Sequence, residues 1–125
     1  MLHLSWIESH STAVGFPDVD YCCYGVEGNL ELKAGPDIDV LASQVQWFKE
    51  RLVAGGWPLF LVQWDDVYMI IPGCWAADIR RNPELENMLR RATTIWTGKL
   101  PEAEFMKVLR NPKFEYEKVM QHEHD

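Results

Sequence analysis

Two acids and a lysine between residues 18 and 33 are the side chains of this sequence best suited to chemistry. Asp18 follows a proline, and Glu31 and Lys33 are separated only by Leu32. Because successive side chains of a β-strand point to opposite faces, Glu31 and Lys33 are expected on one face and Leu32 on the other. A carboxylate beside an ammonium group is a candidate site for a cation and a phosphate. A plain surface ion pair is the alternative.

The chain around these residues has the features of a β-hairpin. Residues 18–24 are rich in β-forming side chains, residues 29–33 alternate apolar and polar, and a glycine–asparagine pair at 28–29 supplies turn chemistry. If the two strands pair, the carboxylate of Asp18 lies beside that of Glu31. Two adjacent carboxylates repel each other, and a divalent cation such as Mg²⁺ or Mn²⁺ relieves that repulsion by taking both as ligands.

A site of this kind suits the hydrolysis of phosphodiester bonds. The metal would polarise the phosphate, stabilise the charge of the transition state and acidify a water. We expect Asp18, Glu31 and the backbone carbonyl of Leu32 to bind the metal. Lys33 would orient the water, help to deprotonate it or bind a phosphate oxygen as a point charge.

The residues that follow the hairpin add a resemblance to a known superfamily. Beyond Glu31-Leu32-Lys33 the chain has Ala34-Gly35-Pro36, Asp39, Leu41, Ser43, Gln44 and Trp47. This segment resembles the PD-(D/E)xK nuclease superfamily, in particular its VRR-NUC and Holliday-junction-resolvase-like branches. Those branches have a Glu-x-Lys strand, a short acidic loop and a helix that presents a glutamine just after a serine. The resemblance covers residues 15–72, about half of the chain.

The resemblance implies a role for each matching residue. Asp18 and Glu31 would be metal ligands, and Lys33 would be the catalytic lysine. Gln44 would support the site by contacting water or phosphate, since it lies at the edge of the apolar stripe of its helix. A solvated helix position is the alternative for Gln44.

A further site residue is expected from the N-terminal region. Many members of the superfamily have an additional acid on an N-terminal helix, and Glu8 is the candidate here. Leu4 and Ile7 are spaced to form one face of such a helix. His10 is a second candidate, as a phosphate contact or proton donor, and an ordinary surface position is the alternative for both Glu8 and His10.

Apolar periodicity predicts the elements that would position these residues. The expected elements are a helix over 41–52 ended by Gly55-Gly56, strands over 59–62 and 67–71 joined at Asp65-Asp66, a helix from Leu85 to Trp96 ended by Gly98, and a short helix after Pro101. Asp37 and Asp39 are expected to cap the first helix, with a position near the metal as the alternative.

This order of elements predicts one nuclease domain over residues 1–125, with an α+β fold. We expect an α/β/α, restriction-endonuclease-like arrangement in which helices flank a central mixed β-sheet of about four strands. The core would span residues 1–73, and residues 74–125 would form a helical C-terminal extension. A chain of 125 residues is long enough for one such domain with its own core.

The charge distribution bears on the partner. The net charge of −7 argues against a protein that coats nucleic acid by electrostatics alone, although a nuclease is compatible with it. The cationic residues lie mostly after residue 80: Arg80, Arg81, Arg90, Arg91, Lys99, Lys107, Arg110, Lys113 and Lys118. The two arginine pairs are candidates for phosphate contacts, with solvated helix faces as the alternative.

The cysteines and the apolar runs bear on location. Three cysteines, two of them adjacent at 22–23, fit reduced thiols in a cytoplasm better than a disulfide scaffold. The longest apolar runs are too short to span a bilayer. We therefore expect a cytoplasmic protein with no membrane partner.

Three functions remain open from the sequence. The first is a Mg²⁺- or Mn²⁺-dependent endonuclease acting on branched or flexible DNA; small members of the resembled branches are often phage homodimers, which implies a phage or prophage source and a homodimer. The second is a non-catalytic phage protein that keeps the nuclease-like fold and binds a host protein. The third is a metal-dependent hydrolase of a small phosphate compound, which requires a closed pocket.

Overall fold

The computed structural model describes residues 2–6 and 19–124 of the chain. Its elements are β1 (Leu2–Trp6), β2 (Val19–Cys23), β3 (Val26–Ala34), α1 (Ala42–Val53), β4 (Leu59–Trp64), β5 (Val67–Pro72), the 3-10 turn η1 (Gly73–Trp75), α2 (Ala76–Arg81), α3 (Leu85–Arg91), β6 (Thr94–Thr97), α4 (Glu102–Arg110) and α5 (Pro112–His124). The class is α+β, as the sequence predicts.

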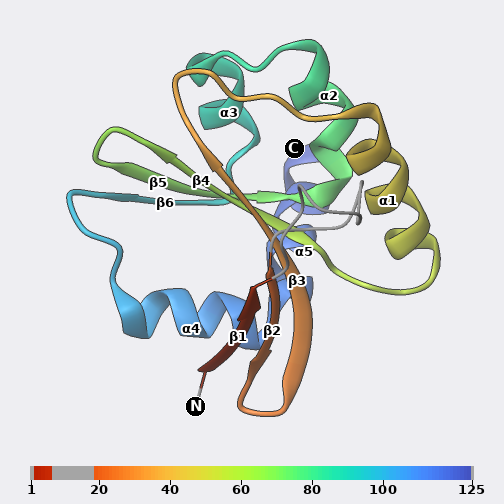
Figure 1. Cartoon of the computed structure of the whole chain (residues 1–125), viewed down its shortest axis with the longest axis vertical. Coiled ribbons are helices and arrows are strands. Elements are labelled where there is room, and N and C mark those ends of the chain that lie inside the picture. Colours follow the sequence, from red (N-terminus) through yellow and green to blue (C-terminus); the bar gives the residue numbers. More distant parts are fainter. Residues whose placement is uncertain (1, 7–18, 125) are drawn as a thin grey trace.

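The centre of the fold is a mixed sheet whose described strands follow one another in chain order, from β1 to β6 (Figure 1). β3 and β4 are parallel and are connected through α1, whereas the other neighbouring strands are antiparallel. The four predicted strands correspond to β2, β3, β4 and β5. The sheet has six strands rather than about four, because β1 and β6 extend it at its two edges.

The two edge strands correct two helix predictions. Residues 2–6 form β1, not part of an N-terminal helix, and their apolar residues alternate with polar ones as a strand requires. The helix expected over 85–96 ends at Arg91. Residues 94–97 then pair with β5, so the region after residue 73 is not a purely helical extension. β-branched Thr94 and Ile95 favour that extended conformation.

The hairpin of β2 and β3 forms, but its turn is at Tyr24-Gly25 rather than at residues 28–29. Tyr24 and Gly25 both have positive φ, +50° and +83°, as a two-residue turn of this kind needs. Gly28 lies within β3 opposite Tyr21. A β-carbon at Gly28 would overlap the Tyr21 ring, so this glycine serves a close approach between strands and not a turn.

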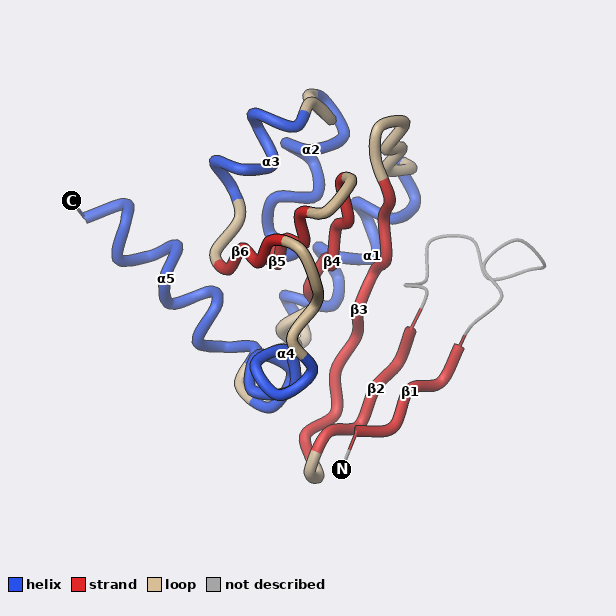
Figure 2. The backbone as a smooth tube through the Cα atoms, turned by 90° about the vertical axis from the view of Figure 1, so that its left-hand side faces the viewer, coloured by secondary structure: helices blue, strands red, loops and turns tan. Residues whose placement is uncertain are grey.

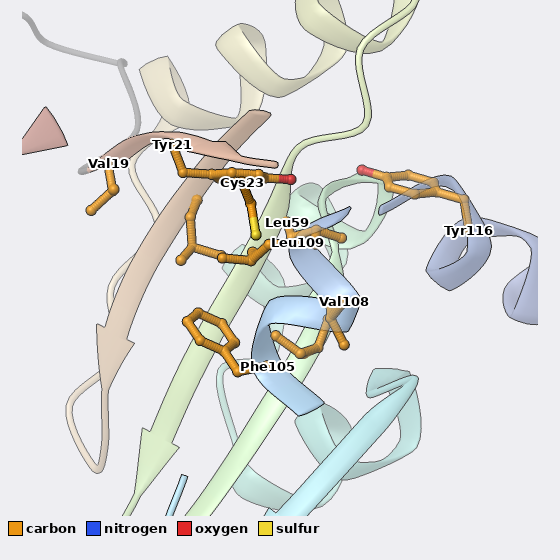
Figure 3. Close-up of a cluster of buried hydrophobic side chains, with 10 residues drawn as sticks. Val19, Tyr21, Cys23, Leu59, Phe105, Val108, Leu109 and Tyr116 are labelled. Carbon is orange, nitrogen blue, oxygen red and sulfur yellow. The ribbon is translucent and has the colours of Figure 1, made fainter. Parts of the chain in front are cut away.

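Helices cover both faces of the sheet (Figure 2). On one side, which we call the α1 face, α1, α2 and α3 pack over a core that includes Phe48, Phe60 and Met88. On the other side, the α4 face, α4 and α5 pack over a second core. Figure 3 shows this second core, in which Phe105 and Leu109 of α4 lie against residues of β2 and β4. Adjacent residues along each central strand therefore enter different cores.

Two buried tyrosines in the second core give a matched test of its hydrogen bonding. Tyr116 donates to the Pro58 carbonyl and accepts from the Gly73 N–H at 2.9 Å. The Tyr21 hydroxyl is buried without a hydrogen-bond partner among the described residues. Burial raises the pKa of both phenols, so both remain neutral at physiological pH.

We expect Tyr116→Phe to lower the free energy of unfolding by about 1 kcal/mol. The variant loses the two hydrogen bonds of the phenol, while the Gly73 N–H and the Pro58 carbonyl keep the bond that they make to each other at 2.9 Å. Tyr21→Phe is the control, since it removes a hydroxyl without breaking a bond to the described part of the chain. Urea denaturation measures both variants. Equal losses of stability in the two variants would contradict the assignment.

Two further sequence predictions concern the described residues. No helix among them is long and apolar enough to cross a membrane. No disulfide joins the three cysteines, of which Cys23 is buried and Cys22 is half-buried. The third, Cys74, lies at the surface in η1.

Candidate active site

Three of the residues singled out in the sequence meet on the α1 face of the sheet. Glu31 and Lys33 lie two residues apart on β3, and Gln44 lies in the first turn of α1. Glu31 is 1% exposed, Gln44 is 6% exposed and the Lys33 side chain is 16% exposed. Strand alternation puts the acid and the lysine on one face, and the crossover through α1 brings the glutamine over them.

The three side chains contact one another directly. The Gln44 amide nitrogen donates to Glu31 Oε1 at 2.7 Å. Lys33 Nζ lies 3.3 Å from the same carboxylate oxygen and donates to Gln44 Oε1, also at 3.3 Å. The amide therefore presents its donor to the anion and its acceptor to the cation. The alternative of a solvated helix position for Gln44 does not hold, because this side chain is buried in the cluster.

A backbone carbonyl holds the lysine from the loop between β3 and α1. Lys33 Nζ donates to the Asp39 carbonyl at 2.7 Å. An ammonium group has three N–H donors, and Asp39, Gln44 and Glu31 offer it three acceptors. The position of the charge is therefore fixed. Any phosphate or water that binds Lys33 has to replace one of the two longer contacts.

Gln44 is itself held by the start of its helix. Its Oε1 accepts the N–H of Leu41, the N-cap residue, at 2.9 Å. Asp37 and Asp39 do not cap the helix as predicted, because the N-cap residue is Leu41 and no side chain caps the helix there. The Gln44 side chain instead accepts the Leu41 N–H, one of the backbone donors that the start of a helix leaves without a partner.

The remaining predicted site residues differ in what the structure describes. Glu8, His10 and Asp18 lie outside the described residues. The described part of β2 begins at Val19, which pairs with Leu30, the neighbour of Glu31. Leu32 pairs with Leu61 in the parallel ladder, within the same strand as Glu31.

The donor chemistry of the site can be compared with the predicted metal. Within residues 19–121 no group of three acidic, histidine or cysteine side chains is placed to hold a metal ion. Glu31 is the one predicted side-chain ligand in that range, and its carboxylate is a hard oxygen donor of the type that Mg²⁺ and Mn²⁺ prefer. The carboxylate of Glu31 is therefore of the type that fits the metal. The second carboxylate of the predicted site is that of Asp18, which is assigned from the sequence.

Three polar residues missed in the sequence lie on the same face. Asp20 pairs with Asn29 across β2 and β3, and the Asn29 amide donates to the Asp20 carboxylate. Arg51 of α1 donates to the Asn29 side-chain oxygen at 3.1 Å. Two patterns in the sequence could have indicated this group. Alternation along the strand places Asn29 on the same face as Glu31, and Arg51 follows Gln44 by seven residues, about two turns of one helix.

The arginine pairs after residue 80 are mainly engaged within the protein. Arg80 donates to the Val40 carbonyl at 2.6 Å. Arg91 binds Asp78 at 2.9 Å and lies 4.0 Å from the Trp75 ring centre. Burial alone would raise the pKa of Asp78, but the hydrogen bonds and charge of Arg91 outweigh it and hold that pKa below its usual value. These contacts give Arg80 and Arg91 structural roles, whereas Arg81 is 78% exposed and lies 3.9 Å from Asp78.

Comparison with known proteins adds no family to this geometry. The chain matches no protein-family model, and no curated protein sequence matches it. The resemblance to the PD-(D/E)xK superfamily therefore stays a prediction from the motif. The chemistry of the site depends on the cluster of Glu31, Lys33 and Gln44.

Proposed function

We propose that this chain is a metal-dependent nuclease that hydrolyses DNA phosphodiester bonds. The observation that supports the proposal is the contact of a buried acid, Glu31, with Lys33 and Gln44 on one face of the sheet. Withdrawing two charges from water is costly, and apolar side chains of similar volume often stabilise a fold as well or better. A buried acid–lysine pair is therefore a better candidate for chemistry than for stability.

The roles in this proposal follow from the contacts of each residue. Glu31 would bind Mg²⁺ or Mn²⁺ together with Asp18 and the Leu32 carbonyl, which are assigned from the sequence. When bound, the metal supplies a Lewis acid for the phosphate and acidifies a water. Lys33 would exchange its 3.3 Å contact with Gln44 for a phosphate oxygen or the attacking water. Gln44 keeps Glu31 in place through its 2.7 Å bond.

The finer parts of the proposal rest on the resemblance. Branched or flexible DNA as substrate, a homodimer, a phage or prophage source and the restriction-endonuclease-like type of fold all come from the branches that the motif resembles. Helices on both faces of a mixed sheet are compatible with that fold type.

A non-catalytic binding protein is the second candidate. It is favoured by the three internal acceptors of Lys33, because a closed network of this kind also serves as a structural ion pair. The net charge of −7 would suit a basic protein partner. The two candidates differ in whether a metal activates the site.

The test is a cleavage assay with four DNA substrates: supercoiled, linear, single-stranded and four-way-junction DNA. We expect cleavage of at least one substrate with Mg²⁺ or Mn²⁺ and none with EDTA. Glu31→Gln is expected to slow cleavage by at least about 100-fold, because the site loses a charge that holds the metal.

Glu50→Gln is the matched control for this variant, since Glu50 is an exposed acid of α1 whose side chain accepts a hydrogen bond from Gln46 at 3.1 Å. It is expected to cleave like the unmodified chain. Folded protein that cuts none of the substrates with either metal would refute the nuclease and favour the binding protein. Equal activity of Glu31→Gln and Glu50→Gln would remove Glu31 from the site.

A further inference from the structure

Two adjoining hollows lie at the junction of α4 and α5, on the opposite face of the sheet from Glu31. The first has a volume of about 410 Å³ and is lined by Tyr24, Val26, Lys107, Arg110 and Asn111. The second, of about 280 Å³, is also lined by Lys107 and Asn111, together with Phe114. We call the two together the α4–α5 groove. It begins where α4 lies beside the hairpin of β2 and β3 (Figure 2).

The charge available in this groove is positive, although the whole chain is acidic. Lys107 and Arg110 line the first hollow without an acidic neighbour in its lining, and no carboxylate among residues 19–121 pairs with either of them. Glu115 lines the second hollow, but it is 2% exposed. Its carboxylate lies 2.8 Å from Lys118 Nζ, which leaves Lys107 as the unpaired charge there.

Glu115 is further occupied by hydroxyl groups. Thr93 Oγ1 donates to Glu115 Oε1 at 2.8 Å, and Thr94 Oγ1 donates to the same oxygen. Lys118 also binds the Thr93 carbonyl at 3.2 Å. This polar cluster is therefore a closed structural unit that forms one wall of the groove. The polar side chains that line the groove outside this cluster are Lys107, Arg110 and Asn111.

Two exposed aromatic rings flank these cations. Tyr24 is 60% exposed and Phe114 is 49% exposed. Arg110 lies 4.6 Å from the Tyr24 ring centre, and Lys118 lies 5.1 Å from that of Phe114. Tyr24 also occupies a positive-φ turn position, which asparagine and glycine favour and a bulky ring does not. Neither the turn nor the buried core explains a tyrosine at this position.

We infer that the α4–α5 groove binds single-stranded nucleic acid. Lys107 and Arg110 would contact backbone phosphates, while Tyr24 and Phe114 would stack with unpaired bases. Cations between exposed aromatic rings suit single strands, because the bases of a duplex are stacked on one another and cannot reach the rings. The groove lies on the α4 face, so this binding needs neither the metal nor the nuclease activity proposed for the α1 face.

The test measures the fluorescence anisotropy of a labelled oligothymidine of about 12 nucleotides, a length within the usual span of a single-strand site. EDTA is present throughout, so that cleavage plays no part. We expect the single strand to bind more tightly than a duplex of equal length. Lys107→Gln with Arg110→Gln is expected to weaken binding at least tenfold and to reduce the slope of log affinity against log salt by about 1.4, for two lost phosphate contacts.

Lys49→Gln with Arg81→Gln is the matched control, because it removes one lysine and one arginine that are exposed on helices of the opposite face. This control is expected to stay within twofold of the unmodified chain. Equal losses of affinity in the two double variants would overturn the site, because they would indicate an effect of net charge alone. Equal binding of single strand and duplex would overturn the single-strand assignment.

The aromatic contact is tested separately at Tyr24. Tyr24→Asn keeps a residue suited to the turn and removes the ring, and it is expected to weaken binding at least about fivefold. Tyr24→Phe keeps the ring and is expected to bind normally. Binding by Tyr24→Asn at the unmodified level would overturn the stacking role. Glu50→Gln, the control variant of the cleavage assay, is expected to bind normally here. Folded protein that cuts no DNA but binds the single strand leaves this proposal intact.

Discussion

Lys33→Met is expected to reduce metal-dependent cleavage of DNA by at least about 100-fold while the chain stays folded. The Lys33 side chain is 16% exposed, and its ammonium lies 3.3 Å from Glu31 Oε1. Methionine fills a similar volume without the charge. Glu31 keeps its 2.7 Å bond from Gln44, and Gln44 keeps its bond from Leu41, so the surrounding positions are retained.

The control for Lys33→Met is Lys49→Met, at an exposed position of α1. Initial rates at saturating Mg²⁺ and Mn²⁺ are compared for both variants, and urea denaturation confirms that both are folded. A purely structural ion pair predicts a loss of stability with no selective loss of cleavage per folded molecule. Cleavage by Lys33→Met at the rate of Lys49→Met would therefore remove the lysine from the chemistry.

Metal binding separates the lysine from the ligands. Lys33 donates bonds and has no lone pair to offer while it is charged, so Lys33→Met is expected to bind Mn²⁺ at least as well as the unmodified chain. Glu31→Gln is expected to bind it more weakly, because a neutral amide replaces the buried carboxylate. Isothermal titration with Mn²⁺ measures both. If Lys33→Met bound Mn²⁺ more weakly than the unmodified chain and Glu31→Gln did not, Lys33 rather than Glu31 would be the residue needed for metal binding.

The central part of the site follows from local patterns in the sequence. Period two places Glu31 and Lys33 on one face wherever the strand forms. Apolar spacing identifies α1, and the motif selects Gln44 on it. The contact between Gln44 and Glu31 was expected only as general support, and the structure gives it as a direct 2.7 Å bond.

The parts that were not predicted depend on contacts distant in sequence. β1 and β6 are short, and short apolar segments fit a helix or a strand until their partner strand is known. The Gly28-Asn29 pair is typical of a turn, but Gly28 lies within β3, where the Tyr21 ring packs against it and leaves no room for a side chain. The bond from Lys33 to the Asp39 carbonyl depends on the path of a loop, which side-chain patterns do not encode.

Phe48→Ala is expected to lower the free energy of unfolding by about 3 to 5 kcal/mol, the largest stability effect that we predict. Phe48 lies one helical turn after Gln44, is 1% exposed, and stacks on Phe60 with ring centres 4.6 Å apart. Phe60 is the strand neighbour of Glu31 in the β3–β4 ladder. The aromatic pair therefore fixes α1 over the strands at the position where Gln44 meets the acid.

Two matched variants separate loss of the ring from loss of the fold. Phe114→Ala removes a phenylalanine that is 49% exposed, and it is expected to change stability by less than about 1 kcal/mol. Phe48→Leu keeps an apolar side chain and should remain folded, but without the stacked ring α1 is held less firmly over β4. If the aromatic contact positions Gln44, Phe48→Leu loses cleavage rate per folded molecule, whereas Val53→Ala, which truncates a valine of α1 that is 89% exposed, does not. Full cleavage by folded Phe48→Leu would show that other contacts of α1 suffice to hold the glutamine at Glu31.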